Sequence, residues 1–236
     1  MRTAILVDGG FYRKRAKHLW GDKTGEERAR ELYAYCQAHL HDRAGGERQL
    51  YRVFYYDCEP VGRKSVYHPL KKVNVDLDKS DTYTWTKAFL EELKTKRKFA
   101  LRLGRLSDYM NYNLKPEVTK QLCAGKRTVD SLTEGDFVFS AQQKGVDMKI
   151  GVDIASLAYK KQVDQIILIA GDSDFVPAAK LARREGIDFI LDPMWGNVTD
   201  DLFEHIDGLK SQWKKRDPQK IVKKTVSDIE PVKVEV

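Results

Sequence analysis

The sequence predicts an α/β fold, a three-layer α/β/α sandwich in which helices cover both faces of a central parallel sheet. Apolar runs typical of strands alternate along the chain with segments of helical spacing, and this alternation favours parallel strands. The clearest strand contains the run 166–170, which is apolar at every position and stops at Gly171. A continuous apolar run is expected for a strand that is buried on both faces of its sheet.

The first half of the chain is expected to supply three strands and three helices. Apolar residues that lead up to Asp8 predict the first strand. A helix follows with apolar residues at helical spacing, and a run rich in aromatic and β-branched residues predicts the second strand. A helix with an aromatic stripe precedes a third strand that alternates apolar and basic residues. In chain order these elements are the strand 4–7, the helices 11–17 and 26–39, the strand 49–56, the helix 82–98 and the strand 99–106.

The second half continues the alternation. The helix that starts near Phe175 carries alanines on one face and is stopped by Gly186. The expected elements are an extra short strand at 137–139, the helix 148–161, the strand 165–170, the helix 175–185, the strand 189–191 and a closing helix at 199–206. Because the strands alternate with helices, their carboxyl ends should meet at one edge of the sheet.

Two segments without a clear period interrupt this pattern and are interpreted as insertions, at about 58–81 and 107–136. We expect one domain over residues 1–208, followed by a basic tail over 209–236. The tail carries eight lysines and arginines, four acidic residues and few apolar residues, so its end should be flexible.

The composition favours a polyanionic partner and a reducing compartment. The net charge is +7, which points to nucleic acid, although a merely basic surface remains an alternative. The three cysteines form no Cys-x-x-Cys pair, so a structural zinc site is not expected. Neither a signal peptide nor a membrane span is evident, and we expect a cytoplasmic protein with no membrane partner.

Acidic residues follow the predicted strands directly. Asp172 and Asp174 come just after the strand 165–170, Asp8 ends the first strand, and Asp147 begins a helix. Read singly, each has an ordinary alternative, because Asp147 and the Asp172–Asp174 pair suit helix caps and Asp8 suits an ion pair. Read together, four carboxylates on one edge repel each other unless a cation lies between them, and oxygen ligands suit Mg²⁺ or Mn²⁺.

The sequence lacks other common phosphate chemistries. We find no P-loop, no dinucleotide-binding glycine motif, no zinc-protease histidine pair and no nucleophilic serine elbow. A water molecule activated by a metal ion is therefore the remaining nucleophile.

Three motifs resemble those of the NYN domain, the LabA-like group of the PIN-like ribonuclease superfamily. They are Asp8-Gly9-Gly10, Lys144-Gly145-Val146-Asp147 and Gly171-Asp172-Ser173-Asp174-Phe175. The resemblance covers most of residues 3–207 outside the insertions. It implies a PIN-like, Rossmann-like sandwich with strand order 3-2-1-4-5, and an endonuclease that hydrolyses RNA with Mg²⁺ or Mn²⁺.

The resemblance also assigns roles by position. Asp8, Asp147, Asp172 and Asp174 would form the catalytic and metal-binding cluster. Asp153 would be a second-tier metal ligand, because it lies about 120° round the helix from Asp147. Many family members carry asparagine three residues after the first aspartate, where this chain has Phe11. That departure would either weaken activity or mark a subgroup that grips its substrate through an aromatic and basic segment.

Five residues are candidates for binding the substrate, and each also has an ordinary structural reading. Ser173 and Lys144 are candidates for contacts to phosphate, and Arg13 and Lys14 for lining its path, although all of these side chains also suit a solvated surface or a turn. Tyr12, like Trp195 and Tyr109, is a candidate for stacking on unpaired bases, with ordinary packing as the alternative.

Other functions remain open from sequence alone. The chain could be a catalytically weak nucleic-acid-binding module, or a metal-dependent phosphatase acting on small phosphate esters. It could also be an interaction protein whose insertion at 107–135 binds a protein regulator. A homodimer is likewise left open.

Overall fold

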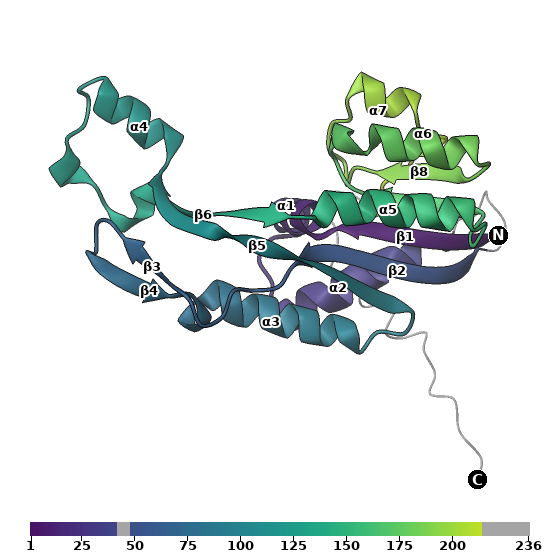
Figure 1. The fold of residues 1–236 in the computed structure, drawn as a ribbon, viewed down its shortest axis with the longest axis horizontal. Helices are drawn as coiled ribbons and strands as arrows, with labels where there is room; N and C mark the ends of the chain where they lie inside the picture. The colour runs from purple at the N-terminus through teal and green to yellow at the C-terminus, as the bar shows by residue number, and fades with distance from the viewer. Residues whose placement is uncertain (42–47, 214–236) are drawn as a thin grey trace, which may run out of the picture.

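The computed structural model describes residues 1–41 and 48–213. Its centre is a seven-stranded sheet with the order β6-β5-β2-β1-β7-β8-β9 (Figure 1). The strands are β1 (Arg2–Asp8), β2 (Gln49–Cys58), β5 (Phe99–Leu114), β6 (Phe137–Lys144), β7 (Gln165–Ile169), β8 (Asp188–Asp192) and β9 (Gly208–Leu209). The five strands predicted for the core are β1, β2, β5, β7 and β8, and they lie in the predicted order 3-2-1-4-5.

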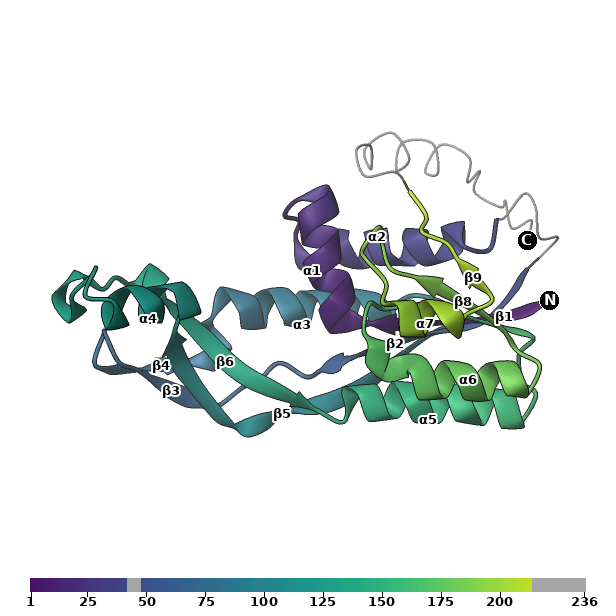
Figure 2. The same ribbon diagram turned by 90° about the horizontal axis from the view of Figure 1, so that it is seen from above.

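The sheet is the middle layer of the predicted sandwich, since its two faces support separate apolar cores. The residues of β1 alternate between them: Ala4 and Leu6 pack in one core, Ile5 and Val7 in the other. Helices α1 (Gly9–Trp20), α2 (Gly25–Ala38) and α3 (Asp81–Lys94) cover one face, and α5 (Val146–Tyr159), α6 (Val176–Arg184) and α7 (Asp200–Glu204) cover the other (Figure 2). The α/β/α fold predicted from the sequence is confirmed.

The first helix begins earlier than predicted, because Asp8 caps it and Gly9 is its first residue. A side chain at position 9 could not be accommodated, since a Cβ there would lie 2.4 Å from the Tyr55 hydroxyl oxygen. The third helix ends earlier than predicted, at Lys94, and Lys98 takes a left-handed backbone with φ 58° before β5 starts.

The second insertion is not irregular as predicted. Strand β5 runs on to Leu114: its first part pairs with β2 in parallel, and its second part pairs with β6 in antiparallel fashion. The predicted strand at 137–139 is the start of β6. This hairpin carries helix α4 (Pro116–Cys123) and projects from the sandwich as an arm (Figure 1). Nearly all residues of both strands are exposed or only partly buried here, and apolar and polar residues are mixed, so the continuous apolar run that reveals a buried strand is missing.

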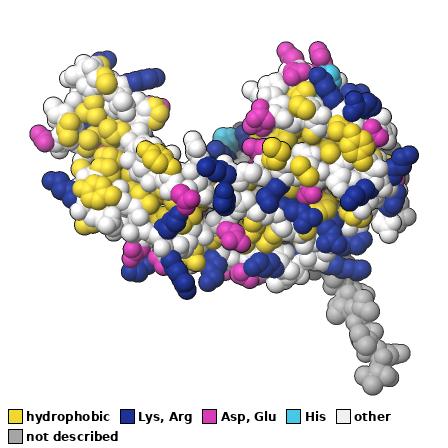
Figure 3. All heavy atoms as spheres, viewed as in Figure 1, with side chains coloured by type: hydrophobic (Ala, Val, Ile, Leu, Met, Phe, Trp, Pro, Cys, Tyr) yellow, Lys and Arg dark blue, Asp and Glu magenta, His cyan; other side chains and the backbone are white. Residues whose placement is uncertain are grey.

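The first insertion folds beside this arm. It forms a hairpin of β3 (Ser65–His68) and β4 (Val73–Asp76), where the sequence suggested only a loop. The buried His68 ring packs on Tyr112 and Phe137 of the arm strands, with ring centroids 4.5 and 5.2 Å apart. The surface is hollowed between the arm and the part of the molecule that carries α6 and α7 (Figure 3). We refer below to β5 and β6 beyond Gly104, with α4, as the arm.

The start of the predicted tail packs on the domain. Strand β9 pairs with β8, and the Trp213 ring lies 5.3 Å from Trp20 and 5.2 Å from Tyr35, centroid to centroid. The rest of the predicted tail, 214–236, lies outside the described residues, as does the segment 42–47. Among the described residues, no helix has both the length and the apolar character that a membrane span needs.

Candidate functional site

The predicted acidic residues lie where the carboxyl ends of β1 and β7 meet. These two strands are parallel neighbours whose last pair is Val7 with Ile169, so Asp8 and the turn at Gly171 leave the sheet side by side. Asp147 reaches the same region from the first turn of α5, which packs on β1 and on the short 3₁₀ turn Ser173–Phe175. Three separate segments of the chain therefore bring carboxylates to one edge of the sheet.

Asp8 is half-buried and fixed by the helix that it starts. Its carboxylate accepts a hydrogen bond from the Phe11 backbone N–H at 3.0 Å, as an N-cap does. Burial raises the pKa of Asp8, the hydrogen bond from Phe11 opposes that rise, and the negative charges of Asp147 and Asp57 add to it. The carboxylate is thus held in an environment that disfavours its charge.

Asp147 experiences the same repulsion from the other side. Burial raises its pKa, and the charges of Asp172 and Asp174 raise it further. It does not cap its helix, because the N-cap is Gly145, which has a left-handed backbone with φ 78° and provides no side chain. Asp172 does act as a cap and accepts the Asp174 backbone N–H at 3.1 Å. Capping therefore applies to Asp172 as the sequence suggested, but not to Asp147, and Asp8 caps a helix where the sequence suggested an ion pair.

Phe11 occupies the space between the two strand ends. A Cβ added to Gly171 would lie 2.4 Å from the Phe11 ring, so a side chain at position 171 would displace this ring. Since the Phe11 N–H also binds Asp8, one residue contacts both halves of the acidic edge. Phe11, at the position where asparagine was expected, supports the spacing of the acids but offers them no polar side-chain atom.

The four carboxylates are chemically suited to a divalent cation. Within the described part of the chain, none of them forms an ion pair with a basic side chain, and their oxygens are the donors that Mg²⁺ and Mn²⁺ prefer. No three acidic, histidine or cysteine side chains among the described residues are gathered closely enough to enclose a metal by themselves.

Comparison with known proteins identifies the domain type. The model of the NYN domain, which is part of the PIN-like superfamily, matches residues 87–201. Residues 87–201 carry an NYN domain. The matched stretch includes Asp147, Asp172 and Asp174, whereas Asp8 lies before it. No curated protein matches the sequence. A solved structure of a protein of unknown function from Vibrio parahaemolyticus is 15% identical, with a TM-score of 0.46, and the alignment covers 91% of this chain and 94% of that chain.

Three of the other predicted site residues lie exposed around the acidic edge of the NYN domain. Ser173 is on the 3₁₀ turn between Asp172 and Asp174, Lys144 ends β6 just before α5, and Lys14 is on α1. Arg13 is half-buried, and its guanidinium is engaged by Asp57, to which it donates at 3.1 Å.

Two predicted residues are engaged elsewhere. Tyr12 cannot stack on a base, because it is fully buried and its hydroxyl donates to Glu31 at 3.1 Å. Its spacing with Ala16 and Trp20 places it on the buried face of α1, a signal that the sequence contained. Asp153 accepts hydrogen bonds from the Tyr56 hydroxyl at 2.7 Å and from Arg102 at 3.0 Å, so its carboxylate already has two donors.

Asp57 was not among the predicted site residues, although it lies at the carboxyl end of β2 as Asp8 lies at the carboxyl end of β1. It is 2% exposed, and it accepts hydrogen bonds from the Tyr55 hydroxyl at 2.7 Å and the Cys58 backbone N–H at 2.8 Å. Arg13 and Gln143 each donate to it at 3.1 Å. The predicted strand order could have identified Asp57. Because β2 is the direct neighbour of β1 in that order, a carboxylate at the end of β2 is expected to lie near Asp8.

Replacing Asp8 with asparagine should raise the melting temperature of the NYN domain in EDTA at neutral pH. The pKa of Asp8 is raised in the folded protein, so its folded form binds protons more tightly and its ionisation costs stability as pH rises above the ordinary aspartate range. Asparagine removes the charge and keeps the cap to Phe11. Thermal denaturation at pH 7 and at a pH below the ordinary pKa of aspartate checks this. The gain in melting temperature of Asp8→Asn over wild type should vanish at the lower pH. Equal melting temperatures of the two proteins at pH 7 would show that the charge of Asp8 does not destabilise the fold.

Proposed function

We propose that this protein is a metal-dependent endoribonuclease that hydrolyses RNA phosphodiester bonds. The observation that supports it is the meeting of Asp8, Asp147, Asp172 and Asp174 at one edge of an NYN domain, with raised pKa values at Asp8 and Asp147. Groups held in an unfavourable charge state at the end of parallel strands are typical of functional sites rather than of structural ion pairs. The basic net charge of +7 is consistent with an RNA substrate.

In this proposal the acidic residues have two tasks. Asp8, Asp172 and Asp174 would hold Mg²⁺ or Mn²⁺, and Asp147 would complete the ligand set or orient the attacking water. A bound divalent cation would supply the Lewis acidity that activates water and offsets charge on the phosphate. Phe11 fixes the distance between Asp8 and Gly171, and the hydrogen bond within the turn fixes Asp172 against Asp174. Ser173 and Lys144, both exposed beside the acids, contact the substrate phosphate.

Hydrolysis at this site would leave a 5′-phosphate and a 3′-hydroxyl, with the proton of the attacking water passing to solvent or to Asp147.

We also propose a cytoplasmic location. The three cysteines Cys36, Cys58 and Cys123 are all free, which suits a reducing compartment.

Cleavage of single-stranded RNA should require Mn²⁺ or Mg²⁺ and stop in excess EDTA. It should also fall on acidification at a pH above the ordinary aspartate range, because protons compete with the cation for Asp8 and Asp147, whose pKa values are raised. Gel analysis of a 5′-labelled RNA, with and without EDTA and across pH at limiting Mn²⁺, measures both effects. Products that carry a 5′-phosphate are expected.

Cleavage that survives EDTA would refute the metal mechanism. A control in which excess Mn²⁺ is returned after EDTA should restore the activity, which separates chelation from damage to the protein. A profile that stayed flat through the carboxylate range at limiting Mn²⁺ would show that Asp8 and Asp147 do not hold the cation.

The second candidate is an RNA-binding protein with little turnover. The specific observation in its favour is Phe11, which places an aromatic ring where an asparagine would offer polar atoms between Asp8 and the Gly171 turn. Binding without turnover would still weaken steeply with salt, because it rests on phosphate contacts. RNA binding that is salt-sensitive and accompanied by no cleavage in Mn²⁺ would favour this candidate.

A further inference from the structure

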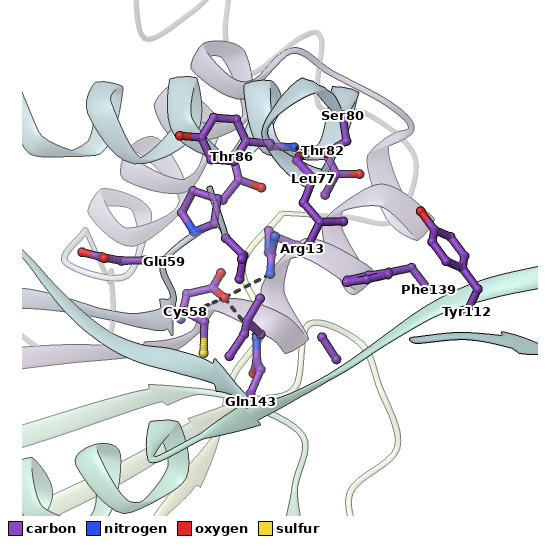
Figure 4. Close-up of a pocket in the computed structure, with 16 residues that line it drawn as sticks. Arg13, Cys58, Glu59, Leu77, Ser80, Thr82, Thr86, Tyr112, Phe139 and Gln143 are labelled. Carbon is purple, nitrogen blue, oxygen red and sulfur yellow. Dashed lines mark hydrogen bonds and ion pairs between the residues drawn. The ribbon is translucent and has the colours of Figure 1, made fainter. Parts of the chain in front are cut away.

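A pocket of about 300 Å³ opens next to the acidic edge, between the sheet and the two insertions. Its walls come from β2 and the loop after it, from α3, and from the arm strands β5 and β6, while α1 contributes Arg13 (Figure 4). A pocket of this size is at the small end of the range for ligand sites and suits a single nucleotide-sized group. Most of its lining comes from the first insertion and the arm.

The floor of the pocket is a fixed polar cluster. The buried Asp57 holds Arg13 and Gln143 through hydrogen bonds of 3.1 Å each, and Figure 4 shows both side chains meeting there. Gln143 uses one amide N–H in this way. Its carbonyl oxygen and second N–H have no partner within the described part of the chain. An amide that is held in place and presents one donor and one acceptor can read the hydrogen-bonding edge of a base.

The wall contributed by the arm is aromatic. Tyr112 and Phe139 line the pocket from β5 and β6, with ring centroids 5.5 Å apart in an edge-to-face arrangement. Phe139 is 36% exposed, so part of its ring is open to a ligand. Unpaired bases bind proteins by stacking on such rings while polar side chains contact their edges.

Gly10 joins this pocket to the acidic edge. A Cβ built on Gly10 would lie 3.4 Å from an Asp8 carboxylate oxygen and 3.7 Å from the Gln143 amide oxygen. The pocket floor and the first acid of the proposed cutting site are therefore separated by little more than one residue. A strand whose phosphate lay at Asp8 would have a neighbouring base within reach of Gln143.

We propose that this pocket binds one unpaired nucleobase of the RNA strand, adjacent to the phosphate that is cut. The inference deepens the proposed function and rests on it. Stacking on Phe139 supplies affinity, and the Gln143 amide supplies discrimination among bases. A base that is paired in a duplex is stacked between its neighbours and cannot enter, so the substrate class is RNA with an unpaired nucleotide at the cut.

The test measures whether the loss of one RNA base and the loss of the Phe139 ring have dependent effects on RNA binding. A short labelled single-stranded RNA, and a series carrying one abasic site at each successive position, are titrated with the full chain in Ca²⁺ and followed by fluorescence anisotropy. One abasic position should weaken binding to wild type by roughly 5- to 150-fold, the effect of losing one base stack. The same abasic site should leave the RNA affinity of Phe139→Ala almost unchanged, because this variant has already lost the ring on which the base stacks.

Two further variants serve as controls for the loss of the ring and for the loss of an exposed aromatic side chain elsewhere. Phe139→Leu retains an apolar side chain of similar volume but no ring, and should behave as Phe139→Ala does. Tyr67→Ala removes an aromatic ring that is 54% exposed on β3, outside the pocket, and should bind every RNA as wild type does. Circular dichroism shows whether each variant is folded.

The outcomes separate the pocket from the nuclease. Coupling at one position supports the pocket even if no RNA is cleaved in Mn²⁺, in which case only the proposed function fails. Cleavage in Mn²⁺ without coupling at any position overturns the pocket and leaves the nuclease standing. Nucleoside monophosphates that bind with the same dependence on Phe139, while no oligomer position shows coupling, would make the ligand a free nucleotide and also overturn the proposal.

Discussion

Replacing Asp172 and Asp174 together with asparagine is expected to reduce Mn²⁺-dependent RNA cleavage by about 100-fold or more, because stabilisation of charge by a bound metal is worth several kcal/mol. Both side chains are exposed at the end of β7, and the Asp172 side chain caps the turn through an oxygen that asparagine retains. The variant should therefore fold as wild type does. Initial rates of cleavage of a labelled RNA at saturating Mn²⁺ provide the measurement.

Asp164→Asn is the matched control, since Asp164 lies just before the opposite end of the same strand. It is exposed and bound to Arg2, and the backbone N–H of Arg2 lowers its pKa, so its role is structural. Cleavage by this variant should equal that of wild type. Equal rates for wild type and the double variant at Asp172 and Asp174 would remove both residues from the proposed cutting site.

Replacing Asp57 with alanine should lower the free energy of unfolding by about 3 kcal/mol, the lower end of the cost of breaking a buried charge pair. Four donors from Tyr55, Cys58, Arg13 and Gln143 lose their acceptor. The lower end applies because the Arg13 side chain is 28% exposed and can be hydrated in part. Urea denaturation followed by tryptophan fluorescence gives the value.

Asp57→Asn and Asp108→Ala are the controls for the loss of stability in Asp57→Ala. Asparagine keeps the shape and an acceptor oxygen, so it should lose less stability than alanine. Asp108, whose side chain is 95% exposed in its pair with Lys64, should leave the free energy of unfolding nearly unchanged when replaced with alanine. A loss at Asp57→Ala no larger than that at Asp108→Ala would mean that the cluster under the pocket contributes no stability.

The core strands were predictable from the sequence because each strand carries its own signal, whereas their order 3-2-1-4-5 was implied only by the resemblance to the NYN domain. A buried strand such as β7 (Gln165–Ile169) is made almost entirely of apolar residues, and this pattern is visible along the chain without knowledge of any partner. The antiparallel continuation of β5 was not predictable from the same rule. Its residues 105–114 are stabilised by pairing with β6, so they need no apolar run of their own.

The residues of the candidate site also fall into a group that the sequence could predict and a group that it could not. Asp8, Asp172 and Asp174 are recognisable because they follow strands directly, and parallel strands bring their carboxyl ends to one edge. Tyr12 was misread because the predicted helix stopped at Lys17, before Trp20 completes the buried stripe. Gln143 and Phe139 carry no signal in the sequence, since their position depends on how the arm returns to the sheet.

The sequence by itself determined the α/β sandwich and the elements that end in carboxylates, because local apolar patterns and strand ends are properties of short segments. The strand order followed only from the resemblance to the NYN domain. Only the tertiary structure decided which side chains have partners. It joined Asp153 to Tyr56 and Arg102, placed Phe11 against Gly171, and enclosed a pocket above Asp57. These are contacts between segments far apart in the chain, and their formation depends on packing across the whole sheet, which no local pattern records.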